Sequence, residues 1–321
     1  MSILKGKAVV ITGSGRGIGA ACAKGAARQG ALVVINDVNA SEAEARAAEI
    51  TAEGGTAIAS PGDVTDWRQA GEIIRSCIDR FGRIDGLVNN AALLHHGRID
   101  EFDEAAAQAL VRVNVLGPMY CTAHAIKPML AQGSGSIVNV VSGAHMGMPS
   151  LGVYGATKGA VASMVYTWAL ELANTGVRVN ALSPMGATQL LTNSHHFIMG
   201  DGSPLSKQDQ DLEAKGLPHL PPPGANSPVI EFLLSDQAAH VNGQLVRMDR
   251  GALQLYTHPA LLMPPVVRSE WTAELVAKAF SEEFKDKQVP CGVLETTHIP
   301  VEHHTRKRTD LSDLDRQRLG V

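Results

Sequence analysis

Aromatic residues are scarce in this chain, and no stretch of it concentrates charge of one sign. Aromatics make up 4% of its 321 residues, and the formal charge of −4 is spread along the chain without a basic block. Nucleic-acid binding normally needs such a block, so we expect no nucleic-acid partner. Hydrophobic residues still reach 45%, and 32 residues are glycine. This composition favours a parallel sheet packed closely under helices over an all-β sandwich.

Cysteine is also rare, and long apolar runs are missing. The four cysteines form no CxxC pair, which argues against a disulfide framework and against a structural zinc site. Nothing approaches 18 consecutive apolar residues, and the first residues lead into an apolar strand without a signal-peptide pattern. We therefore expect no membrane segment, and we expect a cytoplasmic location.

Short β-branched runs alternate with Ala- and Glu-rich stretches along most of the chain. Such alternation is typical of βαβ units, and it predicts an α/β fold with a doubly wound, mostly parallel sheet of the Rossmann type. The expected strands are 8–12, 31–36, 56–60, 84–89, 136–141, 177–182 and 244–248. The expected helices are 18–29, 41–53, 65–81, 103–132, 154–175, 228–235 and 272–284.

The amino-acid composition changes in the second half of the chain. Residues 189–227 are rich in proline, glycine and polar residues, which indicates a long flap beside the substrate rather than core. Residues 252–321 form a tail with a proline break and a charged end. We expect one domain over residues 1–251 and a C-terminal extension that is not an independent domain.

A glycine cluster, TGSGRGIG at 12–19, lies between the first expected strand and the first helix. Glycine allows positive φ and a close backbone approach to a pyrophosphate, and a helix N-terminus offers free N–H donors. In this position the cluster predicts a dinucleotide site, whereas the alternative is a tight turn without a ligand. The contacts expected from it are Gly13, Ser14, Arg16, Gly17, Ile18 and Gly19.

Acidic residues follow the next two strands. Asp37 ends the second expected strand, where a carboxylate can accept hydrogen bonds from both ribose hydroxyls and would repel a 2′-phosphate. NAD is therefore expected rather than NADP, although Arg16 leaves NADP open. Asp63 and Val64 follow the third strand, where the adenine can be bound.

Tyr154 and Lys158 are four residues apart, so both side chains lie on one face of the predicted helix. A tyrosine with a pKa of about 10 is a poor base at neutral pH. An ammonium roughly 5 Å away would stabilise the phenolate by about 3 kcal/mol, or about two pKa units. We therefore expect Lys158 to lower the pKa of Tyr154.

The chain resembles the short-chain dehydrogenase/reductase family over about residues 5–251. The motifs that carry the resemblance are TGSGRGIG at 12–19, NNAA at 89–92, Asn114, Ser142 and the Tyr154–Lys158 pair. The resemblance implies hydride transfer between a nicotinamide cofactor and an alcohol or ketone. It also implies a homodimer or a homotetramer.

The resemblance implies a role for each matching residue. Tyr154 exchanges a proton with the substrate oxygen, and Lys158 lowers its pKa and holds the nicotinamide ribose. Ser142 hydrogen-bonds the substrate oxygen, and Asn114 anchors a water that relays protons from Lys158. Further cofactor contacts are implied at Asn90, Ala91, Pro184 and Thr188.

Side chains that follow the fourth, fifth and sixth strands are candidate substrate contacts. They are His95, His145 and Met185. Adjacent histidines invite a metal interpretation, but no carboxylate stands at ligand spacing, so we expect no metal.

These residues predict an NAD(H)-dependent oxidoreductase for a secondary alcohol or ketone with a bulky apolar body, such as a steroid-like, cyclic or aryl alcohol. A 3-hydroxyacyl-CoA dehydrogenase is the alternative enzyme, although Lys207 and Lys215 are the only basic residues that the flap offers to CoA phosphates. The alternative that is not an enzyme is a catalytically silent nucleotide-binding regulator.

Overall fold

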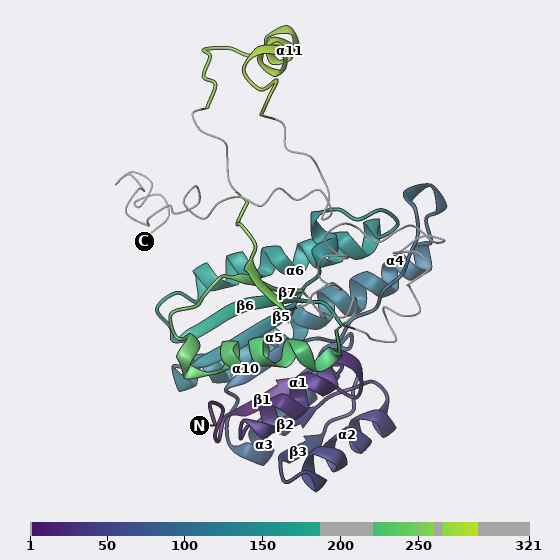
Figure 1. Cartoon of the computed structure of the whole chain (residues 1–321), viewed down its shortest axis with the longest axis vertical. Coiled ribbons are helices and arrows are strands. Elements are labelled where there is room, and N and C mark those ends of the chain that lie inside the picture. Colours follow the sequence, from purple (N-terminus) through teal and green to yellow (C-terminus); the bar gives the residue numbers. More distant parts are fainter. Residues whose placement is uncertain (1, 187–220, 250, 260–264, 288–321) are drawn as a thin grey trace. The chain divides into compact units, whose positions relative to one another are not determined.

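The computed structural model describes residues 2–186, 221–249, 251–259 and 265–287. The chain divides into two compact units, residues 1–256 and 257–321. The first unit holds one eight-stranded sheet with helices on both faces (Figure 1). The predicted fold class is confirmed.

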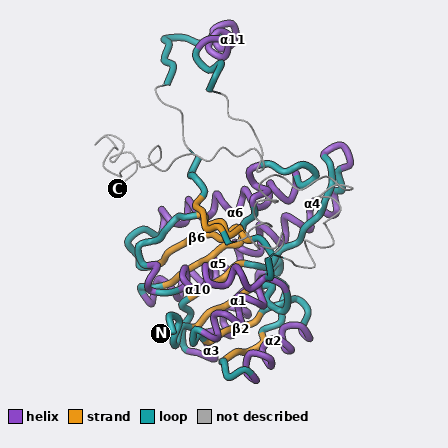
Figure 2. The backbone as a smooth tube through the Cα atoms, viewed as in Figure 1, coloured by secondary structure: helices purple, strands orange, loops and turns teal. Residues whose placement is uncertain are grey.

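The strand order in the sheet is β3-β2-β1-β4-β5-β6-β7-β8. Figure 2 shows the strands in orange among the purple helices. The first seven strands are parallel, and β8 pairs with β7 antiparallel. The bounds are β1 Ala8–Ile11, β2 Leu32–Ile35, β3 Thr56–Ala59, β4 Gly86–Asn89, β5 Gly135–Val140, β6 Val177–Pro184, β7 Leu245–Asp249 and β8 Ala252–Leu255.

Helices cover the sheet in two layers. Those described in the first unit are α1 Gly17–Arg28, α2 Ala40–Ala52, α3 Trp67–Phe81, α4 Glu104–Val111, α5 Gly117–Gln132, α6 Gly152–Glu171 and α10 Ser227–Leu234. Short helical turns are η1 Ile99–Glu101, η2 Arg112–Leu116, η3 Gly143–Met146, η4 Pro223–Asn226 and η5 Asp236–Ala238. The core clusters place α1, α2 and α10 against one face of the sheet and α3, α5 and α6 against the other.

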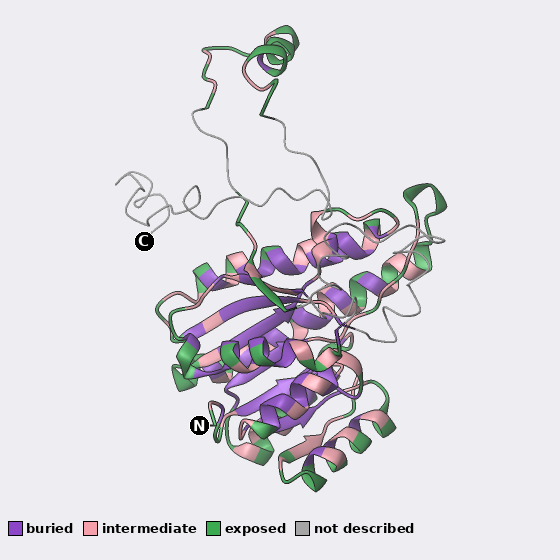
Figure 3. Ribbon diagram, viewed as in Figure 1, coloured by how far each residue is buried: buried purple, intermediate pink, exposed green. Residues whose placement is uncertain are grey.

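The central strands are buried and mostly apolar because both of their faces are covered. All four residues of β1 and all four of β4 are buried (Figure 3). Chain order along the sheet reverses between β1 and β4, since the chain first builds outward to β3 and then returns. In such sheets the ligand crevice lies at the carboxyl ends of the strands at this point of reversal, which is where the glycine cluster follows β1.

Three local features differ from the sequence-based expectation. The helix expected over 103–132 contains one π-helical turn, η2, in which the Gly117 amide donates to the Arg112 carbonyl. Helix α6 begins at Gly152, so Tyr154 lies within its first turn. The sheet continues past residue 251 into β8, a segment that the sequence places in the tail.

Of the expected flap, residues 221–227 are described, and they include η4 and the first residue of α10.

The second unit contains α11, Ala273–Glu282, in its described part. The Thr272 side chain caps this helix by accepting from the Leu275 amide. Arg268 pairs with Glu283 at 2.6 Å. In the part of both units that the structure describes, no helix is long and apolar enough to cross a bilayer.

Asp85 anchors the amino end of the sheet and gives a test of stability. Its carboxylate is 5% exposed, accepts the Ala8 amide at 2.9 Å and pairs with Arg83 at 2.5 Å. Asp85→Ala leaves that buried amide unsatisfied, so we expect the free energy of unfolding to fall by about 1–3 kcal/mol in urea titration. Arg98 and Asp100 form a pair of the same spacing at the surface, and Asp100→Ala should leave stability essentially unchanged. Equal losses in the two variants would contradict this account.

Candidate active site

The turn after β1 keeps its glycines for steric reasons. Gly13 and Gly17 have φ of 59° and 60°, in the left-handed region that favours glycine. A Cβ at Gly19 would lie 2.5 Å from the Gly13 carbonyl oxygen and equally crowd Asn90. A Cβ at Gly13 would lie 2.7 Å from Cα of Ala91. The backbone here therefore forms a cradle that only glycine allows.

The first turn of α1 presents open amide groups to this cradle. In this described segment no side chain caps the helix, and its first turn holds no acidic residue. Asn39 caps α2 and Asp66 caps α3 through their side chains, whereas α5, α6 and α10 resemble α1 in having no side-chain cap. An uncapped N-terminus combines free N–H donors with the positive end of the helix dipole, and this combination suits a phosphate group. The residues present therefore fit a dinucleotide pyrophosphate.

Hydrogen bonds within the turn and from the segment after β4 hold the cradle in place. The buried Ser14 hydroxyl donates to the Ile11 carbonyl at 2.6 Å. The Thr12 hydroxyl accepts the amides of Asn90 and Ala91 at 3.0 and 3.1 Å. The Asn90 side chain donates back to the carbonyls of Thr12 and Gly13, both at 2.9 Å. Asn90 and Ala91 thus lie directly against the glycine turn.

Asp37 follows β2 and lies beside the same turn. Its Oδ2 accepts the Gly15 amide at 3.2 Å, and its Oδ1 accepts the Asn39 amide at 3.1 Å. Arg46 reaches the turn from α2, where its Nε donates to the Gly15 carbonyl at 3.3 Å. A carboxylate and a guanidinium therefore both adjoin the position expected for an adenosine ribose.

Asp63 and Val64 follow β3. The Asp63 carboxylate accepts the Thr65 amide at 2.8 Å, and its own amide donates to Gln69 at 3.0 Å. Val64 is buried, and a Cβ at Gly117 would lie 2.9 Å from its side chain. These contacts fix the loop at the third strand end, on the same edge of the sheet as the glycine turn.

Tyr154, Lys158 and Ser142 form one cluster. Tyr154 is 9% exposed and Lys158 is 3% exposed. The Lys158 ammonium lies 5.7 Å from the centre of the Tyr154 ring and donates to the Val140 carbonyl at 2.8 Å. Ser142, two residues after the end of β5, hydrogen-bonds Tyr154 through its side chain. The structure thus brings together three of the four residues expected to carry the chemistry.

Asn114, the fourth residue expected to carry the chemistry, is fully buried in the π-helical turn η2. Its side chain exchanges hydrogen bonds with the Leu93 backbone at 2.8 and 2.9 Å and donates to the Thr157 hydroxyl at 3.1 Å. Thr157 in turn donates to the Tyr154 carbonyl at 2.7 Å. A π-helical turn often marks a functional position, and here Asn114 joins the loop after β4 to α6.

The acid–base properties of the cluster are set by burial. Burial raises the pKa of Tyr154 to about 12, against a smaller lowering by its hydrogen bond from Ser142. Burial lowers the pKa of Lys158 to about 8. Burial therefore outweighs the lowering of the Tyr154 pKa that we expect from Lys158, and that lowering stays a prediction for the protein with its cofactor bound. The reason is that the Lys158 ammonium is directed to the Val140 carbonyl, and desolvation of the phenolate outweighs its field.

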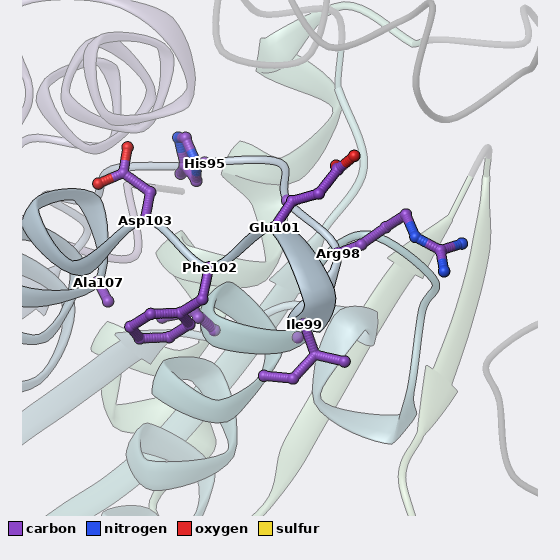
Figure 4. A pocket seen from close by; sticks show the side chains of 10 residues that line it. His95, Arg98, Ile99, Glu101, Phe102, Asp103 and Ala107 are labelled. Carbon is purple, nitrogen blue, oxygen red and sulfur yellow. The ribbon is translucent and has the colours of Figure 1, made fainter.

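The candidate substrate residues lie on three different segments, which follow β4, β5 and β6. His95 is exposed and lines a shallow hollow with a volume of about 30 Å³ together with Phe102, Gly152 and Val153 (Figure 4). The hollow lies beside the residues that precede Tyr154 rather than over the glycine turn. His145 is half-buried in η3, and its Nδ1 contacts the Ser142 carbonyl.

Residues after β6 approach α1. Met185 is half-buried, and its carbonyl accepts the Asn226 side chain at 2.8 Å. Pro184 pairs with Met248 at the end of β6. A Cβ at Gly186 would lie 3.7 Å from the Ile18 side chain, so the carboxyl end of β6 adjoins the first turn of α1. Thr188 lies outside the described residues.

Thr157, Thr12 and Tyr256 contribute contacts that we did not expect from the sequence. Thr157 lies between Tyr154 and Lys158 in the sequence, and Thr12 is the first residue of the glycine motif. These positions within known motifs are the sequence features that could have indicated their roles. Tyr256, directly after β8, contacts His145, and nothing local in the sequence indicates this contact. Among the described residues, no group of three His, Cys, Asp or Glu side chains could hold a metal ion.

The lowered pKa of Lys158 predicts how stability depends on pH. Between pH 8 and 10.5 the unfolded chain holds a proton on Lys158 that the folded chain has lost, so unfolding takes up a proton. The free energy of unfolding should therefore gain a rising contribution with pH across this window. Lys158→Met removes the titrating group, so the wild-type curve should rise relative to the variant curve in urea titrations from pH 7 to 10.5. Parallel curves would contradict the shift, because the buried cysteines and Tyr154 are common to both proteins.

Comparisons with known proteins agree with this arrangement. The family model for short chain dehydrogenases matches residues 7–196. A 3-oxoacyl-[acyl-carrier-protein] reductase from Synechocystis is 36% identical over 78% of this chain and 98% of its own length. The 2-(S)-hydroxypropyl-CoM dehydrogenase 3 of Xanthobacter autotrophicus is 34% identical over 77% of this chain and 97% of its own length.

A solved structure gives the same result. The gluconate 5-dehydrogenase of Burkholderia cenocepacia, in complex with NADP and tartrate, superimposes with a TM-score of 0.69 at 32% identity. The match covers 78% of this chain and 96% of that one. The chain therefore belongs to the short-chain dehydrogenase/reductase family, whose members use a nicotinamide cofactor, and it is an oxidoreductase that acts on alcohols or ketones.

Proposed function

We propose that this protein is an NAD(H)-dependent oxidoreductase that interconverts a secondary alcohol and a ketone with a bulky apolar body, with Tyr154 as the acid and base. The observation that carries the proposal is the buried Tyr154 hydroxyl, hydrogen-bonded to Ser142 beside the Lys158 ammonium. Tyr154 lies in the first turn of α6, and its buried phenol has a serine hydroxyl and an ammonium beside it. Such a phenol is suited to proton transfer.

A bound nicotinamide supplies the hydride for ketone reduction, or accepts it in alcohol oxidation. The chain's own residues handle the proton. With its pKa raised to about 12, Tyr154 holds its proton at neutral pH and donates it to the substrate oxygen as a ketone is reduced. Ser142 donates a second hydrogen bond to that oxygen and stabilises the developing charge. In oxidation the same phenol must first lose its proton, so a higher pH favours that direction.

Lys158 and Asn114 assist the Tyr154 phenol in proton transfer. Lys158, with its pKa lowered to about 8, still carries a proton at neutral pH and can return one to Tyr154. Asn114 holds Thr157 and the loop after β4 in fixed relation to α6. A water bound near Asn114 would complete the path from Lys158 to solvent. This role comes from the family resemblance.

The surroundings of Tyr154 favour an apolar substrate. Tyr154 packs in a cluster with the buried side chains of Leu110, Ala144 and Leu151. Partly buried Leu94, Met148 and Val153 border the same cluster. We propose that such side chains, with His95, His145 and Met185 at the rim, contact the body of the substrate. Charged substrate groups would find few partners here.

A hydroxyacyl thioester substrate is the second candidate. Its support is the Synechocystis relative, which is named as a reductase of 3-oxoacyl groups on acyl-carrier protein. Lys207 and Lys215, which we named as partners for CoA phosphates, lie outside the described residues. Assays with cyclic, aryl and steroid alcohols against 3-hydroxyacyl-CoA distinguish the two substrate classes.

The preference for NAD rests on Asp37. Its carboxylate lies at the end of β2 beside Gly15, where it would accept hydrogen bonds from ribose hydroxyls and repel a 2′-phosphate. NADP is the alternative, because Arg16 opens α1, Arg46 contacts the same turn, and the Burkholderia structure holds NADP. The remaining proposals are a domain over residues 1–251 followed by an extension, a homodimer or homotetramer, and a cytoplasmic location.

Removal of the Tyr154 hydroxyl tests the proposed chemistry. Tyr154→Phe keeps the ring but lacks the proton donor, so kcat should fall by at least about 10²-fold, while NADH affinity changes less than about threefold. Turnover is measured at 340 nm, and NADH binding by fluorescence titration. Tyr166→Phe, on the same helix, is the matched control and should keep wild-type turnover. Full activity of Tyr154→Phe would refute the proposed role, and a biological effect retained without turnover would favour the silent regulator.

Replacement of Asp37 tests the cofactor preference. Asp37→Ser removes the ribose acceptor and the charge that repels a 2′-phosphate. The KM for NAD should rise about tenfold or more and the KM for NADP should fall, because about 1.4 kcal/mol corresponds to a tenfold change. Glu44→Gln on exposed α2 changes the net charge equally and should alter neither value. A wild-type enzyme that already prefers NADP would overturn the proposal.

A further inference from the structure

Tyr256 follows β8, the strand that extends the sheet beyond its expected end. The Tyr256 amide donates to the Leu245 carbonyl at 2.9 Å, which continues the β7–β8 pairing by one residue. In that register its side chain lies on the same face as Leu245 and Arg247, the face that α6 covers. The residue is thus brought from the far edge of the sheet towards the helix that carries Tyr154.

The Tyr256 hydroxyl is held by two partners. Arg247 donates to it at 3.3 Å, and it lies 3.1 Å from the Ser183 hydroxyl on β6. Because the tyrosine oxygen accepts from Arg247, its own hydrogen is available for Ser183. Arg247 is fixed in turn by the buried Asp249 at 2.6 Å. Two strands therefore determine where the ring lies.

The ring of Tyr256 packs against His145. The two ring centres are 5.1 Å apart at an interplanar angle of 66°, within the edge-to-face range for aromatic pairs. His145 belongs to η3, and its Nδ1 contacts the carbonyl of Ser142. On its other side, a Cβ at Gly159 of α6 would lie 4.0 Å from Cβ of His145. His145 thus lies between α6 and Tyr256.

Ser142 is held by its own turn and by Tyr154. It is half-buried and lies two residues after the end of β5, and its hydroxyl accepts the Ala144 amide at 3.2 Å within the same turn. Through His145, the turn that holds Ser142 also contacts Tyr256. A displacement of a hydrogen-bond donor by about 1 Å costs a large factor in rate when the donor acts on a developing charge.

We propose that Tyr256 is a positioning residue, which acts through His145 to hold Ser142 in line with the Tyr154 hydroxyl. The inference rests on the proposed function, because it assigns Tyr256 to the same proton-transfer site. It makes the strand after β7 part of the catalytic apparatus rather than of the C-terminal extension. The ring of Tyr256 carries the effect, and its hydroxyl orients the ring.

Substitution of the ring and of the hydroxyl separates this role from general stabilisation. Tyr256→Leu removes the aromatic contact with His145, and kcat for reduction of acetophenone and cyclohexanone should fall about tenfold. The KM for NADH should stay within about twofold, since the glycine turn is untouched. Tyr256→Phe keeps the ring and should retain at least about half of the wild-type kcat. Leu253→Ala, at an exposed position of β8 on the opposite face, is the matched control and should match wild type.

A double mutant tests the path through His145. If Tyr256 acts through that residue, His145→Ala with Tyr256→Leu should be no slower than His145→Ala alone. Additive losses would overturn the path. Should Tyr256→Leu fail to fold, Tyr256→Met fills the same space without an aromatic edge and serves in its place.

Hydrogen exchange gives a readout that needs no substrate. The amides of Ala144 and His145 donate within the Ser142 turn, and Tyr256→Leu should raise their exchange rates about tenfold while those of β1 stay unchanged. Unchanged exchange in η3, or a wild-type kcat in Tyr256→Leu, would overturn the proposal. A wild-type protein without turnover on alcohols and ketones would refute the proposed function instead, and the exchange measurement would still decide whether Tyr256 holds the turn.

Discussion

One hydrogen bond connects the sheet to the chemistry of this protein, the bond from the buried Lys158 ammonium to the Val140 carbonyl at the end of β5. An ammonium without a partner could not be kept at 3% exposure, because desolvation of a charge is costly. This bond fixes α6 against the carboxyl edge of the sheet, one helical turn from Tyr154. Ser142 follows β5 two residues later, so the same strand end supplies both the anchor and the hydrogen bond to the phenol.

The nucleotide cradle depends on the same edge of the sheet. The glycine turn follows β1, Asp37 follows β2 and Asn90 follows β4, because parallel strands bring their carboxyl ends together. Thr12 and Asn90 join the turns after β1 and β4 by four hydrogen bonds. The cofactor cradle and the tyrosine cluster are therefore two parts of one edge, and their separation is set by the sheet.

Much of this arrangement was predictable from local patterns. Seven strands and the fold class follow from alternating β-branched and helical stretches, and the glycine turn from its motif. The π-helical turn at Asn114, the strand β8 and the contact of Tyr256 with His145 were not predictable, because each depends on partners distant in sequence. The depth at which the Tyr154 phenol is buried was not predictable either, because the spacing of Tyr154 and Lys158 locates a charge but says nothing of burial.

The central claim is that Tyr154 transfers the substrate proton from a site where burial keeps the phenol protonated. The most direct measurement is kcat/KM against pH from 6 to 10 in both directions with one alcohol and its ketone. The account predicts that alcohol oxidation rises steadily with pH as the phenolate fraction grows, while ketone reduction stays level through neutrality. An oxidation rate that does not change with pH over this range would contradict it.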